Sequence, residues 1–318
     1  MKKTNIVFMG TPDIAVPTLE ALNKKYNISA VVTVPDKPKG RGMKLLPSDI
    51  KIKATELELP ILQPIILKDI SFITNLKELN PDIIVVFAFR FLPKEVYEIA
   101  NIAAFNIHTS LLPKYRGAAP INWAIINGEK NTGLTSFILD DKIDTGPIIL
   151  QKEITISDNS TAGDLYNIMK NVAPDFAITT CEKLLTNQYT ITHQNQHNNI
   201  HPAPKLFREN VEINWEQSAT TITNFINGCS PVPCAWTTWE DKKLQIIRAK
   251  VSNNIEEFSN KKAGEFYILS DNFLVNSKNG IVELIEIKLE NKNAMFVENF
   301  LNGFRGNKTG MFKYAENK

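Results

Sequence analysis

The 318-residue sequence has few cysteines, no excess of charge and no long apolar run. Its three cysteines, Cys181, Cys229 and Cys234, lack the paired spacing of a metal site, and an odd number without a secretion signal indicates reduced thiols in the cytosol. The first apolar run stops at Gly10, which is too early for a signal-peptide core or a membrane span. We therefore expect a soluble, cytoplasmic protein with no membrane contact.

Two further absences narrow the function. A formal net charge of +2 neither requires nor excludes a polyanionic partner, because such a partner binds a local basic surface. The turn Gly10-Thr-Pro-Asp13 contains one glycine only, so the fingerprint of a dinucleotide fold is missing and a nicotinamide or flavin cofactor is disfavoured. His193, His197 and His201 are four residues apart, but their Asn- and Gln-rich surroundings favour a solvated linker over a metal site.

The length exceeds the usual size of one hydrophobic core, so we expect two domains. In the first, strands rich in Val, Ile and Phe alternate with helices, which is typical of a doubly wound α/β fold whose mostly parallel sheet is buried on both faces. The predicted strands are 4–9, 28–34, 82–89, 103–108 and 133–139, and the predicted helices are 12–22, 48–57, 69–79, 93–99, 118–126 and 162–185.

The second part of the chain has a different pattern of predicted secondary structure. Residues 190–204 are polar and indicate a linker. Short β-like segments follow at 235–239, 244–249, 264–269, 273–275 and 280–287, which predicts a small, OB-like β-barrel. The expected boundaries are a first domain at 1–188, a linker at 189–206 and a second domain at 207–318.

Two polar side chains mark the end of one predicted strand. Ala104, Phe105 and Ile107 define the strand, and its alternation places Asn106 and His108 on the same face. Ligands of parallel sheets bind at the carboxyl ends of the strands, where these residues lie. An amide donor beside an imidazole that titrates near neutral pH could stabilise an oxyanion while a proton moves, which indicates acyl chemistry.

A carboxylate would orient the histidine, and the next predicted strand ends in a segment that contains Asp140, Asp141 and Asp144. Spacing alone does not choose among the three. Asp144-Thr-Gly146 also spells the short signature of aspartic proteases, but those enzymes need two such carboxylates in an all-β setting.

A basic, Pro- and Gly-rich segment at 35–44 follows the second strand and carries Lys37, Lys39, Arg41 and Lys44. Two interpretations stay open for it: a solvated surface loop, or a basic arm that binds nucleic-acid phosphates.

At these residues the chain resembles methionyl-tRNA formyltransferases, over nearly its whole length. The resemblance begins with Val7-Phe-Met-Gly-Thr-Pro-Asp13, continues through Pro35-Asp-Lys-Pro-Lys-Gly-Arg-Gly42, and is densest from Asn106 to Ile121. It implies a formyltransferase-like variant of the Rossmann fold, with a catalytic first domain and a tRNA-binding second domain that begins near Ser230-Pro-Val-Pro-Cys-Ala-Trp-Thr237.

The resemblance also implies roles for particular residues. Asn106, His108 and Asp144 become the catalytic trio, and Ser110, Leu111, Leu112 and Pro113 line the site of the co-substrate 10-formyltetrahydrofolate. Arg41, with the neighbouring Lys37, Lys39 and Lys44, lies in the loop that clamps the initiator methionyl-tRNA. The implied enzyme formylates the α-amine of that tRNA for translation initiation, needs no metal, and is expected to be a monomer.

One departure stands out. Relatives usually carry a Tyr-Gly pair at the end of the apolar run 82–89, where this chain has Phe89-Arg90, so the backbone on the folate side is expected to differ. The rival interpretations are a formyltransferase for glycinamide ribonucleotide or an amino sugar, a folate-dependent hydrolase that releases formate, and an RNA-binding module on an inactive scaffold.

Overall fold

The computed structural model describes residues 3–39, 44–194, 201–252 and 261–312. The chain forms two compact units. The first comprises Met1–Gly117, Thr132–Ile154 and Tyr166–Pro202, and the second comprises Ala118–Asn131, Thr155–Leu165 and Ala203–Lys318. The second unit therefore takes segments from the middle of the chain as well as its C-terminal part, and the boundaries expected from the sequence stay a prediction.

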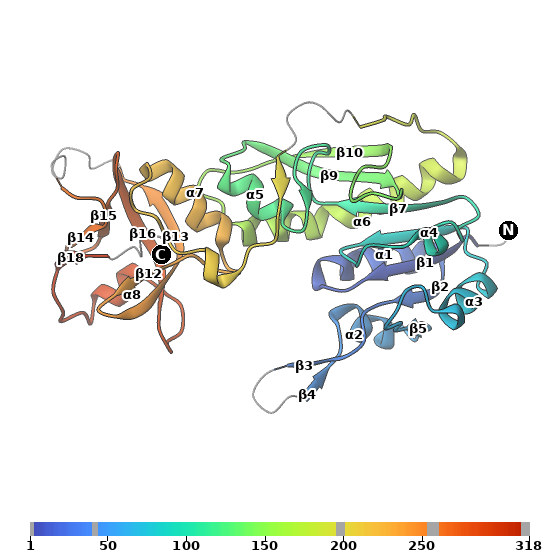
Figure 1. Cartoon of the computed structure of the whole chain (residues 1–318), viewed down its shortest axis with the longest axis horizontal. Coiled ribbons are helices and arrows are strands. Elements are labelled where there is room, and N and C mark those ends of the chain that lie inside the picture. Colours follow the sequence, from blue (N-terminus) through green and yellow to red (C-terminus); the bar gives the residue numbers. More distant parts are fainter. Residues whose placement is uncertain (1–2, 40–43, 195–200, 253–260, 313–318) are drawn as a thin grey trace. The chain divides into compact units, whose positions relative to one another are not determined.

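The first unit is built on a seven-stranded sheet of order β10-β9-β7-β6-β1-β2-β5 (Figure 1). Strands β5, β2, β1, β6 and β7 are parallel to one another, whereas β9 is antiparallel to β7. The strands are β1 (Asn5–Gly10), β2 (Asn27–Val32), β5 (Ile61–Leu62), β6 (Ile83–Phe87), β7 (Ala103–His108), β9 (Asn131–Ile138) and β10 (Ile148–Thr155). The predicted mostly parallel sheet is confirmed.

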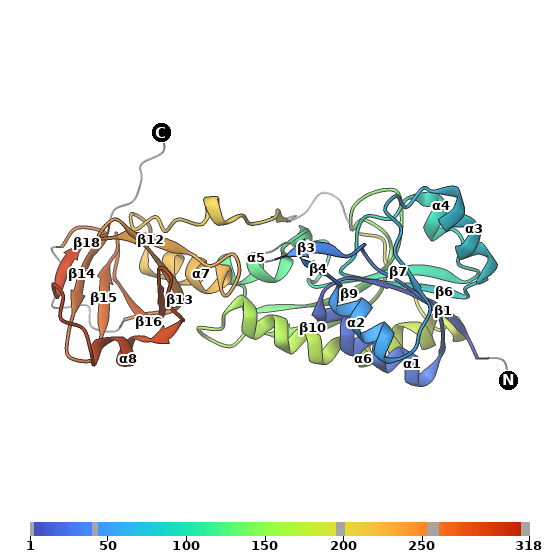
Figure 2. The ribbon, with the colours of Figure 1, turned by 90° about the horizontal axis from the view of Figure 1, so that it is seen from below.

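Helices cover both faces of this sheet, and its central strands β1 and β6 are therefore buried along almost their whole length. Figure 2 shows α3 (Ile70–Glu78) and α4 (Lys94–Tyr97) on one face, and α1 (Val16–Lys25) and α2 (Asp49–Glu56) on the other. Side chains of Ser48 and Asp69 accept hydrogen bonds from backbone N–H groups at the starts of α2 and α3. A 3-10 turn, η1 (Asp13–Ala15), precedes α1, and the long helix α6 spans Ala162–Thr186.

The direction of β9 was not evident from the sequence. Phe105 is paired with Ile138 and His108 with Thr135, so β9 ends beside the start of β7, away from His108. The acidic segment after β9 therefore has to fold back before one of its side chains can approach the imidazole. Two small pairs of strands were also missed: the hairpin of β3 (Lys37–Lys39) and β4 (Lys44–Leu46), and the short β8 (Arg116–Gly117) and β11 (Pro202–Ala203).

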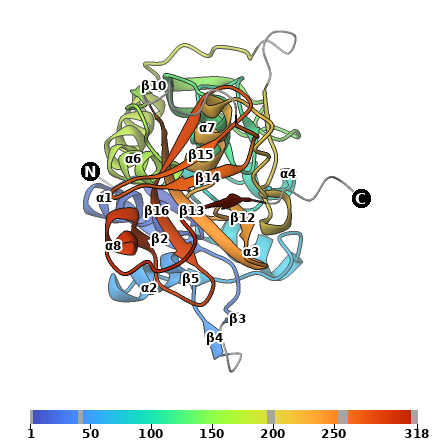
Figure 3. The ribbon, with the colours of Figure 1, turned by 90° about the vertical axis from the view of Figure 1, so that its left-hand side faces the viewer.

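The second unit contains a curved, seven-stranded antiparallel sheet, a half-barrel with the path β12-β13-β16-β15-β14-β18 and with β17 paired to β16. Figure 3 looks onto this sheet. The strands are β12 (Trp236–Trp239), β13 (Lys242–Val251), β14 (Glu265–Ile268), β15 (Phe273–Asn276), β16 (Ile281–Leu289), β17 (Met295–Phe296) and β18 (Thr309–Met311). The five strands predicted in this domain are confirmed, whereas the short β17 and the edge strand β18 were missed.

Helices α5 (Pro120–Ile126), α7 (Ala219–Cys229) and α8 (Val297–Leu301) and the 3-10 turn η2 (Arg208–Asn210) complete the second unit. Helix α7 is capped by Ser218, whose side chain accepts from the backbone N–H of Thr221 at 3.1 Å. It buries Ile222, Ile226 and Cys229, one stripe at helical spacing, against the sheet. The sequence-based prediction contained neither α7 nor α8.

The three cysteines are free and buried. Burial raises the pKa of Cys181 and of Cys229 to about 12, and that of Cys234 to about 11. These side chains therefore remain neutral, packed thiols at neutral pH. Among the described residues, no helix combines the length and the apolar character that a membrane span requires.

Candidate active site

Strand β7 carries Asn106 and His108 to the carboxyl edge of the sheet. Its neighbour β6 ends at Phe87, which is paired with Ile107. Both side chains point to one face because they are two residues apart on an extended strand. Asn106 is half-buried and His108 is buried, at 6% exposure. The structure thus brings the two residues together as the alternation of the strand predicts.

The His108 imidazole is held from one side by the loop that follows it. Its Nε2 lies 2.8 Å from the backbone carbonyl oxygen of Tyr115. A carbonyl only accepts hydrogen bonds, so Nε2 carries a proton and donates it. This bond fixes the ring orientation and leaves Nδ1 as the ring nitrogen that is not bonded to the Tyr115 carbonyl.

Asp144 approaches the other ring nitrogen. Its Oδ2 lies 3.7 Å from His108 Nδ1, a distance that gives an ion pair when the imidazole is protonated but is too long for a hydrogen bond. The same carboxylate oxygen accepts a hydrogen bond from the backbone N–H of Gly117 at 3.0 Å. Asp144 has φ of +54°, a left-handed conformation that turns the chain back toward His108.

The other two aspartates of this segment have different partners. Asp140 accepts hydrogen bonds from the Thr145 hydroxyl, at 2.8 Å to each carboxylate oxygen, and so closes the turn. Asp141 accepts from the Tyr97 hydroxyl at 2.6 Å. Of the three candidates that spacing left open, Asp144 is the one that faces the imidazole.

The Asp144-Thr-Gly146 sequence has a steric explanation. The backbone N–H of Ile138 donates to Pro147 O at 2.9 Å, which brings the returning segment against the end of β9. A Cβ at Gly146 would lie 1.7 Å from the carbonyl oxygen of Ile138. Glycine is therefore required by the close approach of two backbone segments, and the protease interpretation is not needed to explain it.

Asn106 is chemically available. Within the described part of the chain its carboxamide makes no hydrogen bond to another residue. An amide that is half-buried and unpartnered keeps its N–H group for a ligand.

The four residues predicted to line a folate site form the loop after β7. Ser110 and Leu112 are buried, whereas Leu111 and Pro113 are half-buried. The Thr135 hydroxyl donates to Ser110 O at 2.7 Å and accepts from Leu112 N at 3.1 Å. The loop is thus fixed to β9 from inside, and its half-buried members are the ones with surface to offer a ligand.

The Phe89-Arg90 departure has a local consequence. The positive φ in this segment belongs to Ala88, at +52°, one residue after β6. The guanidinium of Arg90 donates to Pro64 O at 2.8 Å and to Ile65 O at 3.0 Å, while its buried Nε has no partner within the described part of the chain. Burial lowers the pKa of Arg90. The arginine thus ties this segment to the loop after β5.

The basic segment forms the β3–β4 hairpin. Lys37 is exposed, Lys39 and Lys44 lie on the two strands, and Arg41 lies outside the described residues. The base of the hairpin is fixed by Asp36, which accepts from Lys51 Nζ at 2.7 and 2.9 Å and from Gln63 Nε2 at 2.9 Å. The hydrogen bond from Lys51 holds the pKa of the Asp36 carboxyl below its usual value.

Sequence reasoning missed three residues that organise this site. Tyr115 contributes a carbonyl, Gly117 contributes an N–H, and Gln194 binds the backbone of the Asp144 segment, donating to Asp144 O at 3.0 Å and to Gly146 O at 2.8 Å. Tyr115 and Gly117 act through backbone groups, which any residue type can supply. Gln194 lies in a polar segment that resembles a linker. No pattern in the sequence points to them.

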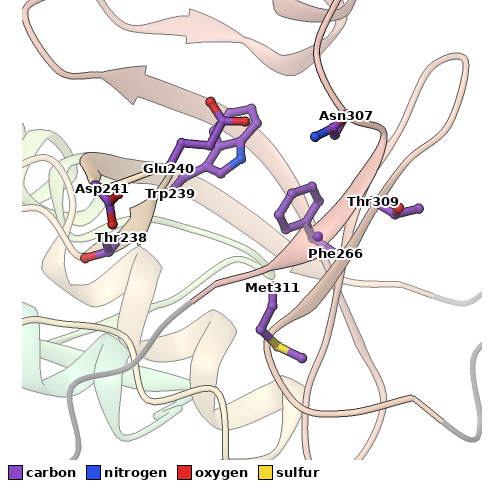
Figure 4. Close-up of a pocket in the computed structure, with 9 residues that line it drawn as sticks. Thr238, Trp239, Glu240, Asp241, Phe266, Asn307, Thr309 and Met311 are labelled. Carbon is purple, nitrogen blue, oxygen red and sulfur yellow. The ribbon is translucent and has the colours of Figure 1, made fainter.

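The second unit contains a cavity of about 250 Å³ (Figure 4). It is lined by Trp239 and Phe266 together with Glu240 and Asp241, and by none of the residues that the sequence predicts for a site. Among the described residues there is also no group of three His, Cys, Asp or Glu side chains that could hold a metal ion.

Comparison with known proteins identifies the family. The model of the formyl transferase family matches residues 3–181, and that of the formyl transferase C-terminal domain matches residues 205–305. The chain belongs to the formyl transferase family.

Curated relatives of this formyl transferase cover it almost completely. It is 43% identical over 305 residues to the methionyl-tRNA formyltransferase of Flavobacterium johnsoniae, which spans 95% of this chain and 97% of the relative. It is 41% identical over 314 residues to the methionyl-tRNA formyltransferase of Thermodesulfovibrio yellowstonii, which spans 98% of this chain and 99% of the relative.

Solved structures share its fold. The sugar 3N-formyl transferase WlaRD, solved in the presence of dTDP and 5-N-formyl-THF, superposes with a TM-score of 0.67 at 22% identity, over 92% of this chain and 100% of that chain. The methionyl-tRNA formyltransferase from Clostridium thermocellum gives a TM-score of 0.55 at 20% identity, over 79% of this chain and 95% of that chain. At these identities the likeness concerns the fold.

Proposed function

We propose that this formyl transferase moves the formyl group of 10-formyltetrahydrofolate to the α-amine of methionyl-initiator tRNA, giving N-formylmethionyl-tRNA. The observation that carries the proposal is the arrangement of His108 between Tyr115 O at 2.8 Å and Asp144 at 3.7 Å. On the same strand face lies the Asn106 carboxamide, which has no partner among the described residues. The names of relatives that are 40–43% identical over nearly the whole chain support the identity of the acceptor.

Formyl transfer makes two demands on a protein. When an amine attacks the formyl carbon, the carbonyl oxygen becomes negatively charged and needs a fixed hydrogen-bond donor. The attacking nitrogen must also lose a proton, which a group that titrates near neutral pH can accept. N10 of the folate must gain a proton as its bond to the formyl carbon breaks and tetrahydrofolate leaves.

The residues around His108 suit these two tasks. The Asn106 N–H serves as the donor to the oxyanion. His108 Nδ1 exchanges the proton, since Nε2 is committed to the Tyr115 carbonyl. Asp144 stabilises the imidazolium that forms, at an ion-pair distance of 3.7 Å. Because the Gly117 N–H fixes the carboxylate, little reorganisation is needed when the charge develops.

The fit of a folate co-substrate rests on the segments that flank β7. The co-substrate supplies a formyl group that is already activated for transfer. Half-buried Leu111 and Pro113 offer apolar surface. The buried Arg90 Nε, beyond the carboxyl end of the neighbouring strand, is an N–H group that no described residue satisfies. Buried donors are rarely left unsatisfied, so a ligand or a water is expected there.

The acceptor arm of the tRNA is assigned to the β3–β4 hairpin, with Lys37, Lys39, Arg41 and Lys44 as phosphate contacts. The exposure of Lys37 and the fixed base at Asp36 support a basic arm that projects from a firm attachment. Such contacts supply affinity that falls with salt and carries no sequence information. We also expect the enzyme to act as a monomer in the cytoplasm and without a metal.

The test incubates the protein with 10-formyltetrahydrofolate and with aminoacylated initiator and elongator tRNAs. Formylation of methionyl-initiator tRNA alone supports the proposal. Transfer to an amino sugar or to glycinamide ribonucleotide would assign a different acceptor, release of free formate would indicate a hydrolase, and RNA binding without either reaction would indicate an inactive scaffold. Each of these three results would overturn the proposal.

A further inference from the structure

Three described residues of the polar segment 190–204 lie against the proposed catalytic residues: Thr192, Gln194 and His201. Its Thr192 forms an isolated bridge with Ile148, the first residue of β10, through N–H to O bonds of 2.8 and 3.1 Å. His201 accepts a hydrogen bond from the backbone N–H of Tyr115 at 2.7 Å, and the two rings stack at 5.8 Å. The composition that predicts a linker therefore also provides attachments to the site.

Gln194 makes the most specific of these attachments. Its amide nitrogen donates to Asp144 O at 3.0 Å and to Gly146 O at 2.8 Å. Its amide oxygen accepts from Arg116, at 2.6 Å from Nη2 and 3.2 Å from Nε. One half-buried carboxamide thus joins the two backbone segments that meet at the Asp144 carboxylate.

The geometry around this carboxylate shows why the join matters. Asp144 sits at φ of +54°, a conformation that costs energy for a residue with a side chain. Its carboxylate is fixed by the N–H of Gly117, the residue after Arg116. Gln194 holds both sides of this contact, one through the carbonyl oxygens of the turn and the other through the Arg116 guanidinium.

We propose that Gln194 is a positioning residue that holds the Asp144 carboxylate against the His108 imidazole. The inference rests on the proposed function, since it assigns Gln194 a part in the same reaction. Gln194 acts through Asp144 and need not touch the substrate. His201 holds the other side of the imidazole through Tyr115, so the segment supports both neighbours of His108.

The kinetic test replaces Gln194 with Met, which keeps the length of the side chain and removes its donor and acceptor. A displacement of about 1 Å in a catalytic group can cost on the order of 100-fold in rate, so kcat for formyl transfer is expected to fall about 10- to 100-fold. Both KM values should change less than about threefold, because no substrate contact is removed. The matched control is His193→Ala, an exposed neighbour in the same segment, which should stay within about twofold of the parent.

A double-mutant cycle separates positioning from general support of the fold. If Gln194 acts through the carboxylate, then Gln194→Met added to Asp144→Asn should reduce kcat by no more than about twofold further. A full additional 10-fold loss in the Asp144→Asn background would overturn the proposal, as would a kcat within twofold of the parent for Gln194→Met alone.

Amide exchange tests the same idea without any reaction. The Gly117 N–H is protected by Asp144, so Gln194→Met should speed its hydrogen exchange about tenfold, and His193→Ala should leave it unchanged. An unchanged exchange rate of the Gly117 N–H in Gln194→Met would disprove the positioning role, even if the protein formylated another acceptor. An inactive parent protein with the expected exchange pattern would instead reject the proposed function and retain the positioning role.

Discussion

The first unit keeps polar side chains buried at one end of its sheet, whereas the second unit fills its interior with aromatic rings. In the first, His108, Ser110 and Thr135 are buried and bonded to backbone groups or to one another. In the second, the Trp239 ring lies within 6.3 Å of five phenylalanine rings: Phe266, Phe273, Phe300, Phe304 and Phe312. Buried polar networks stabilise only when every member is satisfied, while buried aromatic rings stabilise through the apolar area they bury and the contacts between rings. We expect substitutions to reduce rate in the first interior and stability in the second.

The largest effect is expected for Trp239→Ala. Removal of a large ring that is 9% exposed leaves a cavity among the phenylalanines, so the free energy of unfolding of the second unit should fall by about 3–5 kcal/mol. Calorimetry or urea unfolding measures this. Phe296→Ala, on a ring that is 54% exposed, is the control and should cost about 0.5 kcal/mol or less. Equal losses in the two variants would contradict the assignment of the aromatic core.

Asn106→Ala should have the opposite effect to Trp239→Ala: it should reduce the rate of formyl transfer and leave stability almost unchanged. Loss of one oxyanion donor typically costs about 3 kcal/mol of transition-state stabilisation, so turnover should slow by roughly 100- to 1000-fold. The KM values and the unfolding midpoint should barely change, because the carboxamide has no partner among the described residues. Steady-state kinetics with Asn75→Ala, an exposed asparagine of α3, as control would check it. A loss below tenfold would remove Asn106 from the mechanism.

A smaller effect, on stability, is expected for substitution of Asp13. This residue belongs to a polar cluster of the first unit, with Lys170 and Tyr166, that lies outside the site. Burial raises the pKa of Asp13, but hydrogen bonds from Lys170 and Tyr166 outweigh it, so the net pKa lies below the usual 3.8. The stabilisation is therefore present above about pH 4 and is lost as pH falls through the lowered pKa. Because the side chain is 48% exposed, Asp13→Asn should cost less than about 1 kcal/mol at pH 7.

Urea unfolding of the parent and of Asp13→Asn at several pH values would check this. The difference between them should shrink as the pH is lowered from 7 toward 3. A difference that grows on acidification would mean that the carboxylate is not stabilised by Lys170 and Tyr166.

The smallest effect is expected for Lys37→Ala on the hairpin. One phosphate contact fewer should weaken tRNA binding about two- to threefold and reduce the slope of log affinity against log salt by about one. Lys24→Ala, at the end of α1, is the control. Binding titrations at several salt concentrations measure both quantities, and an unchanged slope would take Lys37 out of the interface.

The fold could be predicted where one pattern dominates. Strand β6 is a solid apolar run, and β7 is apolar except for Asn106 and His108. A mostly parallel sheet follows from the alternation of such strands with helices. The direction of β9 could not be predicted, because an apolar run has the same composition in either direction. Helix α7 was missed since its Thr, Asn and Gly residues have low helix propensity, and its apolar stripe is visible only against the sheet it covers.

The site shows the same division. Asn106 and His108 follow from strand alternation, whereas the preference for Asp144 over Asp140 and Asp141 came from resemblance and depends on a turn at positive φ. The supports at Tyr115 O, Gly117 N and Gln194 are backbone groups or a residue in a polar segment, so residue type carries no signal for them.

The burial of all three native thiols makes the chain convenient for site-specific labelling. Their raised pKa values, about 11 and 12, keep thiolate scarce at neutral pH, and thiolate is the form that attacks maleimides. A single cysteine placed at exposed Lys37 would therefore react first, without removal of any native cysteine. A fluorophore there would report the approach of labelled tRNA to the hairpin in real time.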